Sequence, residues 1–396
     1  MHDLNNPYPF YAELRRSCPV HRVGDSSFYV VSTWDLIAEA LARPQDFSSN
    51  LTATMLWRDD HTVGEVDIAS FGAPLHVLAT ADGDRHRGHR TMVMPSLVAG
   101  RVRALEAFVR DTYHQLWRAG LDEHNRIDWV QAVAQRLPMT VIAHLVGLPA
   151  CDIDDLLRWT LASTVLLDAV VTTEEVRDAV AAVVEFSTYL AEAFDAAVTA
   201  PGTDVVSDLA RAAAGGDIDR ETAIHMLIQI VTAGAESTVS LLGTSVWMLG
   251  RRPDTVEQLR TDHTLVPVFI EEALRLESPF RGHYRHVVND TTLGDVHLPA
   301  GSHLYLAWGS ANRDPERFDN PDTLDLRPPR RRTHMAFGKG LHLCVGAALA
   351  RLQGRIGVEF LLESTTALKL DNPAPDWTPS VLSRRLRTLP MTVRPS

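Results

Sequence analysis

One cysteine of the chain lies in a setting suited to chemistry, at position 344 within Phe337–Gly346 (Phe-Gly-Lys-Gly-Leu-His-Leu-Cys-Val-Gly). Gly338 and Gly340 permit a tight turn because they have no Cβ, so the main chain can pass close beneath a flat ligand. Downstream, Val345–Leu362 has the apolar periodicity of a helix, which places Cys344 at a helix N-terminus. Unpaired amide N–H groups and the positive end of the helix dipole favour a thiolate there, and a thiolate is the form of cysteine that binds metal.

A lone cysteine is usually an inert buried side chain. This one lies in a run that resembles the haem-binding signature of the cytochrome P-450 family, Phe-Gly-x-Gly-x-His-x-Cys-x-Gly, and Ala347–Arg351 resembles its continuation in bacterial members. The resemblance implies that Cys344 is the axial ligand of the iron of haem b (heme b, iron protoporphyrin IX). It also implies cofactor contacts from Phe337, Gly338, His342 and Gly346.

The segment Ile224–Leu249 is long and apolar enough to be tested as a membrane span. Its centre, Thr232–Thr238, is made of small and polar residues, and a lipid-facing carboxylate at Glu236 would be costly. Asp219 before the segment and Pro253 after it are helix start and stop signals. The sequence therefore predicts a long helix buried in protein.

In the family that this chain resembles, a central helix crosses the haem with the pattern Ala-Gly-x-(Asp/Glu)-Thr. Here the pattern runs from Ala233 to Ser237, and the resemblance implies that Ala233 and Gly234 contact the haem. Glu236, Ser237 and Thr238 are the candidate catalytic residues: a hydroxyl holds a proton beside bound oxygen, and a carboxylate resupplies it. Serine lacks the methyl group and the χ1 stiffness of threonine, so the coupling of electron flow to product could be looser, or the reaction could differ from simple hydroxylation.

Positive side chains are expected at the edge of the haem. His86 and Arg90 lie four residues apart and so share one helix face. The resemblance implies that they contact the haem propionates, as does Arg285, whose fork suits a carboxylate. The alternative for the first two is a pair of exposed surface cations.

Glu272 and Arg275 lie three residues apart within one predicted helix and can pair across a turn. The resemblance implies a structural ion pair on the thiolate side of the haem. Family members often add a third basic residue, but Thr323 occupies that position here. The sequence leaves open whether Arg327 or Arg330 substitutes for it.

The resemblance also places a substrate pocket. Its candidate residues are Gln229, Phe280, Arg281, His283, Tyr284 and Leu382, with Phe47–Gly83 as a further wall. Three of them, Arg281, His283 and Tyr284, are unusually polar for a wall beside a haem, which favours a polar aromatic or peptide-derived metabolite with a carboxylate or amide group. Alternatively, these side chains point away or form local hydrogen bonds.

Composition narrows the class of protein. A net charge of −12 over 396 residues argues against non-specific binding to nucleic acid or to anionic membranes. The cysteines Cys18, Cys151 and Cys344 have no paired spacing, which indicates a reducing compartment. The first ten residues lack the pattern of a signal peptide, so a cytoplasmic protein is expected. Basic clusters at 85–90 and 330–339 suggest an acidic partner, or are ordinary solvated faces.

Family-like motifs follow one another in the family's order from Asn6 to Val393, so we predict one domain, residues 1–396, mainly α with small β-sheets, with the cytochrome P-450 fold. The resemblance implies a monomeric haem-thiolate monooxygenase that takes electrons from a separate ferredoxin and ferredoxin reductase and oxidises a small organic substrate, a secondary metabolite. The alternatives are an oxidative-coupling or peroxide-driven enzyme with the same haem, or a non-catalytic haem-binding sensor.

The helices expected elsewhere are Asn6–Arg16, Trp34–Leu41, Asp84–Leu97, Thr140–Pro149, the amphipathic region Leu156–Ala200 and Val266–Glu277, and the strands are Phe28–Ser32, Val287–Trp308 and Arg384–Val393.

Overall fold

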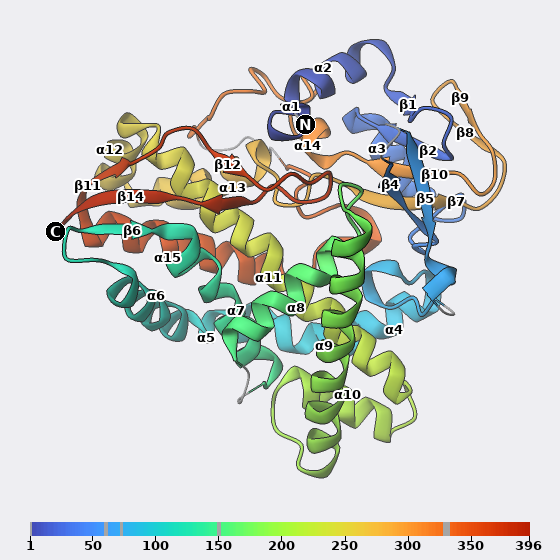
Figure 1. Ribbon diagram of the computed structural model, residues 1–396, viewed down its shortest axis with the longest axis horizontal. Helices are drawn as coiled ribbons and strands as arrows, with labels where there is room; N and C mark the ends of the chain where they lie inside the picture. Colours follow the sequence, from blue (N-terminus) through green and yellow to red (C-terminus); the bar gives the residue numbers. More distant parts are fainter. Residues whose placement is uncertain (1, 59–61, 72–73, 149–151, 328–332) are drawn as a thin grey trace.

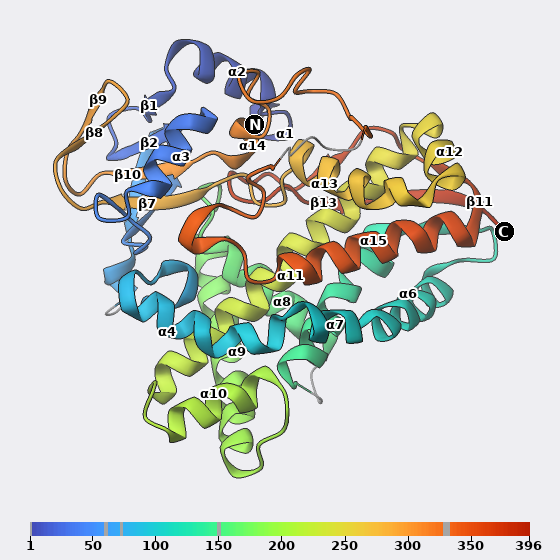
Figure 2. The same ribbon diagram turned by 180° about the vertical axis from the view of Figure 1, so that it is seen from behind.

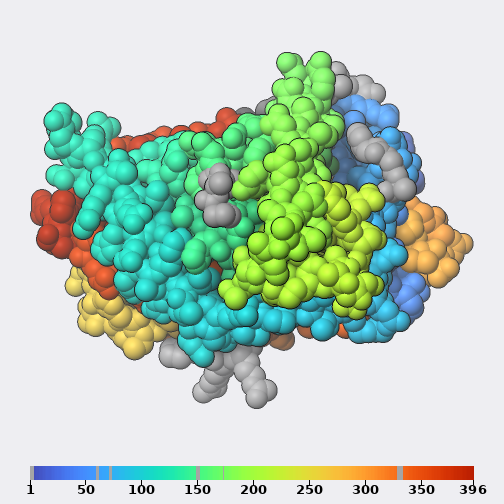
Figure 3. All heavy atoms as spheres, turned by 90° about the horizontal axis from the view of Figure 1, so that it is seen from below, coloured from blue at the N-terminus to red at the C-terminus, as the bar shows by residue number. Residues whose placement is uncertain are grey.

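A computed structural model describes residues 2–58, 62–71, 74–148, 152–327 and 333–396. The fold is mainly helical with small β-sheets, as the sequence predicted. Most helices form one broad body, and a β-rich region with the N-terminal helices lies at its upper edge (Figures 1 and 2). Viewed from below, α10 and the first turns of α11 cover one end of the helical body (Figure 3).

The bounds of the elements agree with most of the predicted ones to within a few residues. The helices are α1 (His2–Asn5), α2 (Tyr8–Ser17), α3 (Trp34–Ala42), α4 (Gly83–Val93), α5 (Ala99–Ala104), α6 (Glu106–Gly120), α7 (Arg136–Val146), α8 (Ile153–Val165), α9 (Thr173–Thr199), α10 (Val205–Ala214), α11 (Arg220–Gly250), α12 (Pro253–Thr261), α13 (Val266–Leu276), α14 (Trp308–Ala311) and α15 (Ala347–Ser364). The strands are β1 (Val20–Arg22), β2 (Phe28–Val31), β3 (Phe47–Ser48), β4 (Ala53–Trp57), β5 (Val63–Asp67), β6 (Arg126–Asp128), β7 (His283–Val287), β8 (Thr291–Leu293), β9 (Val296–Leu298), β10 (His303–Leu306), β11 (Thr365–Leu370), β12 (Asp376–Trp377), β13 (Leu386–Thr388) and β14 (Pro390–Pro395).

The long helix α11 runs through the helical body and packs against α7, α8, α9 and α15. Asp219 caps it as predicted, with a side-chain oxygen accepting from the backbone N–H of Thr222 at 2.6 Å. By length and composition α11 could cross a membrane, but 67% of its most apolar window is buried inside the protein. The predicted assignment as a core helix is therefore confirmed. Its backbone stays helical through Gly234.

The five-stranded sheet has the order β1-β2-β10-β7-β3. One face of it carries Val287, Leu304 and Leu306, which pack with residues of α3 and with Met335, just before the cysteine loop. The other face carries Tyr284 and Tyr305, which pack with the hairpin β4–β5 and the loop between α8 and α9. The sheet thus separates the cysteine-loop side from the side of the hairpin.

Two expectations about local structure need correction. No strand was predicted within 47–83, but this region contains the antiparallel hairpin β4–β5. The strand predicted from Val287 begins earlier, at His283, so the polar residues 283–285 are strand residues whose side chains alternate between the two faces of the sheet. The expectations that concern Cys151 and Arg330–Arg332 lie outside the described residues.

Candidate active site

The cysteine loop has the geometry that its glycines require. Gly338 and Gly340 have φ of 67° and 74°, a region that a side chain with Cβ rarely adopts. The backbone N–H of Cys344 donates to the carbonyl of Phe337 at 2.9 Å, and α15 begins at Ala347 with Gly346 as its N-cap. The loop is thereby closed into a tight turn that presents the sulfur at the start of a helix, as predicted.

The Cys344 side chain has free surface, yet burial is the main influence on its thiol and raises its pKa. The sulfur therefore has open space next to it although protein surrounds it on its other sides. Backbone N–H groups of Gly346 and Ala347 and the charges of Arg351 and Arg90 oppose the rise in pKa by favouring the thiolate. These N–H groups and charges are the ones that would stabilise a thiolate if a metal were bound to the sulfur.

The accessible face of α11 carries the candidate relay. In the middle of α11, Ala233 is exposed whereas its neighbours are buried or half-buried, and Gln229 and Ser237, one turn away on either side, are half-buried. The Ser237 hydroxyl donates to the carbonyl of Ala233 at 2.7 Å. Thr238 is buried and its hydroxyl donates to the carbonyl of Gly234 at 2.9 Å. The structure therefore places Ser237, and not Thr238, on the open face of the helix.

Glu236 has a partner that sequence reasoning missed. The side chain is 1% exposed, and its Oε1 accepts from Nε of Arg385 at 3.1 Å. Oε2 is buried and has no hydrogen-bond partner among the described residues. The Ser240 hydroxyl donates to the carbonyl of Arg384 and so fixes the Arg385 backbone against α11. No local pattern in the sequence could have predicted this ion pair, because its two residues are 149 positions apart.

Cationic and hydrogen-bonding side chains gather beside the cysteine loop. The rings of His86 and His342 stack with centroids 4.0 Å apart, and Nε2 of His342 lies 2.9 Å from the hydroxyl of Ser49. Burial, followed by the charge of His342, lowers the pKa of His86 to about 4. Arg90 donates to the carbonyl of Leu343 at 2.9 Å, which places its guanidinium next to the cysteine. His86 is therefore buried and not an exposed surface cation, whereas Arg90 is half-buried and remains partly at the surface.

Arg285 lies on the cysteine-loop face of β7. It is buried, donates to the carbonyl of Tyr284 at 2.7 Å, and has its pKa lowered to about 10 by burial. His283 shares this face because side chains two residues apart on a strand point the same way. Like Cys344, His283 has free surface although burial, followed by the charges of Arg285 and His342, lowers its pKa to about 4. His283 therefore lies near His342 with its side chain accessible, on the cysteine-loop side of the sheet.

Tyr284 lies on the opposite face of the strand. Its ring packs against Phe28 and Tyr305, with centroid distances of 6.0 and 5.4 Å. Phe280 is half-buried 5.4 Å from the ring of His283, and Leu382 is buried. The polar residues 283 and 284 thus face two different environments and cannot both line one wall.

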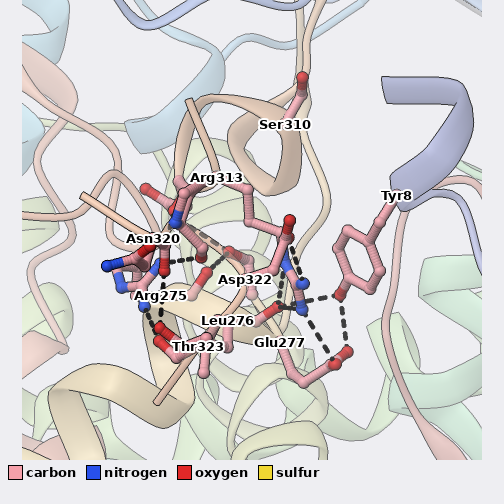
Figure 4. Close-up of polar contacts among 12 residues, drawn as sticks. Tyr8, Arg275, Leu276, Glu277, Ser310, Arg313, Asn320, Asp322 and Thr323 are labelled. Carbon is pink, nitrogen blue, oxygen red and sulfur yellow. Dashed lines mark hydrogen bonds and ion pairs between the residues drawn. The ribbon is translucent and has the colours of Figure 1, made fainter. Parts of the chain in front are cut away.

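The predicted ion pair is present and buried. Arg275 binds both carboxylate oxygens of Glu272, at 2.8 and 2.7 Å. The backbone supplies the additional partners: Arg275 donates to the carbonyl of Thr323 at 2.9 Å, and the N–H of Asp325 donates to Glu272 at 3.0 Å. The Arg327 side chain is 76% exposed and pairs with Asp325, so it does not replace the missing basic residue. Figure 4 shows Arg275 and Thr323 within this network.

The donor set fits a haem. Among the described residues there is no group of three or more His, Cys, Asp or Glu side chains that could hold a metal ion. A metal at Cys344 must therefore bring most of its own ligands, as the iron of a porphyrin does. The side chains of Arg285, His86 and His342 suit the two propionates of such a cofactor.

Comparisons with known proteins agree with this geometry. The family model described as Cytochrome P450 matches residues 204–366. Cytochrome P450 144 of Mycobacterium tuberculosis is 45% identical over 391 residues, 99% of this chain and 90% of that protein. Cytochrome P450 monooxygenase PikC of Streptomyces venezuelae is 34% identical over 98% of this chain and 91% of its own. The solved structure of the cytochrome P450 enzyme CxnD, for C–S bond formation in chuangxinmycin biosynthesis, has a TM-score of 0.86 at 27% identity and covers 98% of this chain and 95% of its own.

Proposed function

The chain belongs to the cytochrome P450 family, and on that premise we propose that it is a bacterial monooxygenase that takes electrons from a separate ferredoxin and oxidises a small secondary metabolite. Its family makes it an oxidoreductase with haem b as cofactor. The observation that carries the proposal is Cys344, an accessible thiol that the glycine turn presents at the start of α15. We further propose that residues 1–396 act as one catalytic domain, as a monomer, in the cytoplasm.

The residues around the cofactor site have separate proposed roles. Bound haem supplies an iron that activates dioxygen. Gly346 and Ala347 direct N–H groups at the sulfur and would help to hold it as the thiolate ligand of the iron. His86, Arg90, His342 and Arg285 would hold the propionates, and Ala233 would leave room on α11 because its side chain is small. The apolar core clusters around α11 keep bulk water away from the pocket.

Proton delivery is assigned to the open face of α11. The Ser237 hydroxyl, held by the Ala233 carbonyl on the accessible face of α11, would be the proton donor next to the cofactor. Glu236 would resupply the proton through its Oε2, which has no hydrogen-bond partner among the residues that the structure describes. Arg385 holds the other oxygen and orients the carboxylate. The side chain of Arg385 is only partly buried, which offers a path from solvent.

Electron delivery is assigned to the surface beside Arg90. This residue lines a hollow of about 570 Å³ together with Thr91, Met94, Pro95 and Val98. Arg90 also bonds to Leu343, so the hollow adjoins the cysteine loop. A basic residue beside exposed apolar side chains suits an acidic electron-transfer protein. The wider cluster at 85–90 is not one open patch, because His86 and His89 are buried.

A second candidate reaction is oxidative coupling. Ser237 stands where the family usually has threonine, and its smaller, less restricted side chain weakens the control of proton delivery that hydroxylation needs. A structural neighbour in the same family, CxnD, is described as forming a C–S bond. Products identified by mass, with or without an added oxygen atom, distinguish the two reactions.

The test of the proposal is an absorption spectrum of the reduced, haem-loaded protein under carbon monoxide. We expect a Soret band displaced far to the red, since a thiolate donates strongly to the iron. The Cys344→Ser variant, loaded with haem, should lose this displacement. A globin-like band in the wild type, unchanged in the variant, would refute thiolate ligation and with it the proposed function.

A further inference from the structure

Gln229, on α11, bonds to the rest of the chain with only one end of its side-chain amide. The residue is half-buried, and its Oε1 accepts from the backbone N–H of Ala79 at 2.7 Å. Its Nε2 donates to none of the described residues and is not one of the buried atoms without a partner, so it is accessible. This nitrogen carries two N–H donors. Both donors are therefore available to a molecule from outside the chain.

The orientation of the Gln229 amide is fixed by the loop that it holds. The N–H of Ala79 can bond only to an acceptor, so the amide oxygen must face the loop and the two ends of the amide cannot exchange places. The loop is held next to this contact as well, because the N–H of Leu78 donates to Nδ1 of His89 at 3.3 Å. The buried Leu78 side chain packs in the same apolar cluster as Val231 of α11. The donor end of the amide therefore points away from the loop.

The backbone of this loop is strained at Leu78. Its φ is 40°, in the left-handed region that residues with a Cβ rarely adopt. Hydrogen bonds from two successive N–H groups, to His89 and to Gln229, hold the loop in this conformation. Strained backbone of this kind persists only where the surroundings fix it, and it is common next to bound ligands.

Gln229 lies on the same accessible face of α11 as the candidate proton relay. Gln229, Ala233 and Ser237 follow one another at intervals of four residues, and each is exposed or half-buried. The rise of an α-helix places Gln229 and Ser237 about 12 Å apart along the helix axis. Only the methyl group of Ala233 stands between them on this face. A molecule that is oxidised next to Ser237 and extends along α11 in this direction therefore reaches Gln229.

We propose that the Gln229 amide donates to an uncharged oxygen of the substrate, a carbonyl or hydroxyl group about two helical turns from the atom that is oxidised. This inference rests on the proposed function, because Ser237 marks the place of oxidation only if it is the proton donor. None of the three residues on this face is charged, and an amide N–H needs no charge on its acceptor. Because the accessible Nε2 can bind water when no substrate is present, selectivity should correspond to one ordinary hydrogen bond.

The test uses probes that bind the haem iron at one end. Each is an imidazole whose ring nitrogen carries an alkyl chain of about two to ten carbons, because the other ring nitrogen is a good ligand for iron. In one series the chain ends in a methyl ketone, and in the other it ends in an isopropenyl group, which has the same shape but no oxygen acceptor. Affinity for the haem-loaded protein is measured by the shift of the Soret band and, independently, by calorimetry.

Two variants separate the donor from the contact with the loop. Gln229→Glu keeps an oxygen for the Ala79 N–H and replaces the two donors by a second acceptor, whereas Gln229→Leu removes both ends of the amide. Gln258→Glu makes the same change of charge at an exposed glutamine of α12 and serves as control. If Gln229 only holds the loop, Gln229→Glu should bind the ketones as the wild type does.

In the wild type we expect the ratio of ketone to isopropenyl affinity to peak at one chain length, about three- to tenfold above its value for the shortest chains. The peak should vanish in Gln229→Glu and in Gln229→Leu and persist in Gln258→Glu. A ratio that does not vary with chain length in the wild type would overturn the proposal even if the Gln229 variants failed to fold, and so would an unchanged peak in Gln229→Glu. A red-displaced carbon monoxide band together with either result would show that only this inference, and not the proposed function, had failed.

Discussion

At the scale of single residues, the surroundings of Glu236 and Ser237 decide how protons reach the pocket. One oxygen of Glu236 accepts from Arg385 and the other has no partner within the described part of the chain, whereas Ser237 bonds to its own helix. A buried carboxylate with an unused oxygen can accept or pass a proton with little rearrangement. The serine hydroxyl can rotate because serine, unlike threonine, is not β-branched.

Ser237→Ala removes the hydroxyl, so reducing equivalents should be lost as peroxide. We expect product per NADPH consumed to fall by roughly a hundredfold, the lower end of the range for loss of a positioned proton donor. NADPH, peroxide and product are measured together with ferredoxin and its reductase present. Ser237→Thr is the matched control, and it should couple at least as well as the wild type. Unchanged coupling in Ser237→Ala would remove Ser237 from the relay.

Single-residue predictions from sequence succeeded where a local motif carried the information. The positive φ angles of Gly338 and Gly340 and the Glu272–Arg275 pair follow from residues only a few positions apart. Arg385 could not be found in this way, because its contact with Glu236 depends on how the C-terminal loop folds back onto α11. Periodicity and spacing contain no information about such long-range contacts.

At the scale of elements, strand β7 determines on which face of the sheet each of the polar residues 283–285 lies. Arg285 and His283 face the cysteine loop, whereas Tyr284 faces the hairpin β4–β5. Sequence alone treated 281–284 as one polar wall, because the start of the strand was placed too late. With the strand beginning at His283, the period of two assigns each side chain to its face.

Gly282→Ala tests how tightly the chain is held before this strand. A Cβ there meets the Tyr305 ring and the Leu306 carbonyl at distances that require movement, so we expect a loss of about 1–3 kcal/mol in the free energy of unfolding. Gly88→Ala on α4 is the control, since a Cβ there meets nothing within 4 Å, and alanine should stabilise that helix by roughly 0.5–1 kcal/mol. Urea unfolding measures both. Equal effects of the two substitutions would contradict the close approach at Gly282.

Helices were predicted better than short strands, for a physical reason. The periodicity of α11 and α15 extends over many turns, and caps such as Asp219 mark where helices begin. The strands of the hairpin β4–β5 are five residues each, too short for a clear alternation. The hairpin is stabilised by packing against residues such as Ala169 and Tyr284, far away in sequence. Such strands depend on tertiary contacts that no local pattern records.

At the scale of the whole molecule, a buried polar network joins the N-terminal helix to the end of α13 and the C-terminal loop. Glu277 accepts from the Tyr8 hydroxyl at 2.6 Å, from Arg384 at 2.7 Å and from Arg313 at 3.3 Å. Figure 4 shows Tyr8, Glu277 and Arg313 converging in this network. The Arg384 guanidinium also stacks 3.4 Å from the centroid of a Trp377 ring. Segments from both ends of the chain therefore depend on one carboxylate.

Because of the Tyr8 hydroxyl in this network, the free energy of unfolding should fall as the pH rises above 10. Burial, followed by the charge of Glu277, raises the pKa of Tyr8 from 10.0 to about 12, against the opposing charges of Arg313 and Arg384. Because the folded-state pKa is the higher one, the stabilisation is fully present below pH 10. It is lost between about pH 10 and 12, where the unfolded chain releases the proton first.

Tyr8→Phe isolates that contribution from those of the other buried tyrosines. Phenylalanine cannot ionise, so the stability advantage of the wild type over Tyr8→Phe should shrink by about 2–3 kcal/mol from pH 9.5 to pH 12. Urea unfolding at a series of pH values measures the difference, and each protein serves as the other's control for general alkaline destabilisation. A difference that stays constant across the series would mean that Tyr8 keeps an ordinary pKa. In that case the network would contribute through packing and not through a shielded hydroxyl.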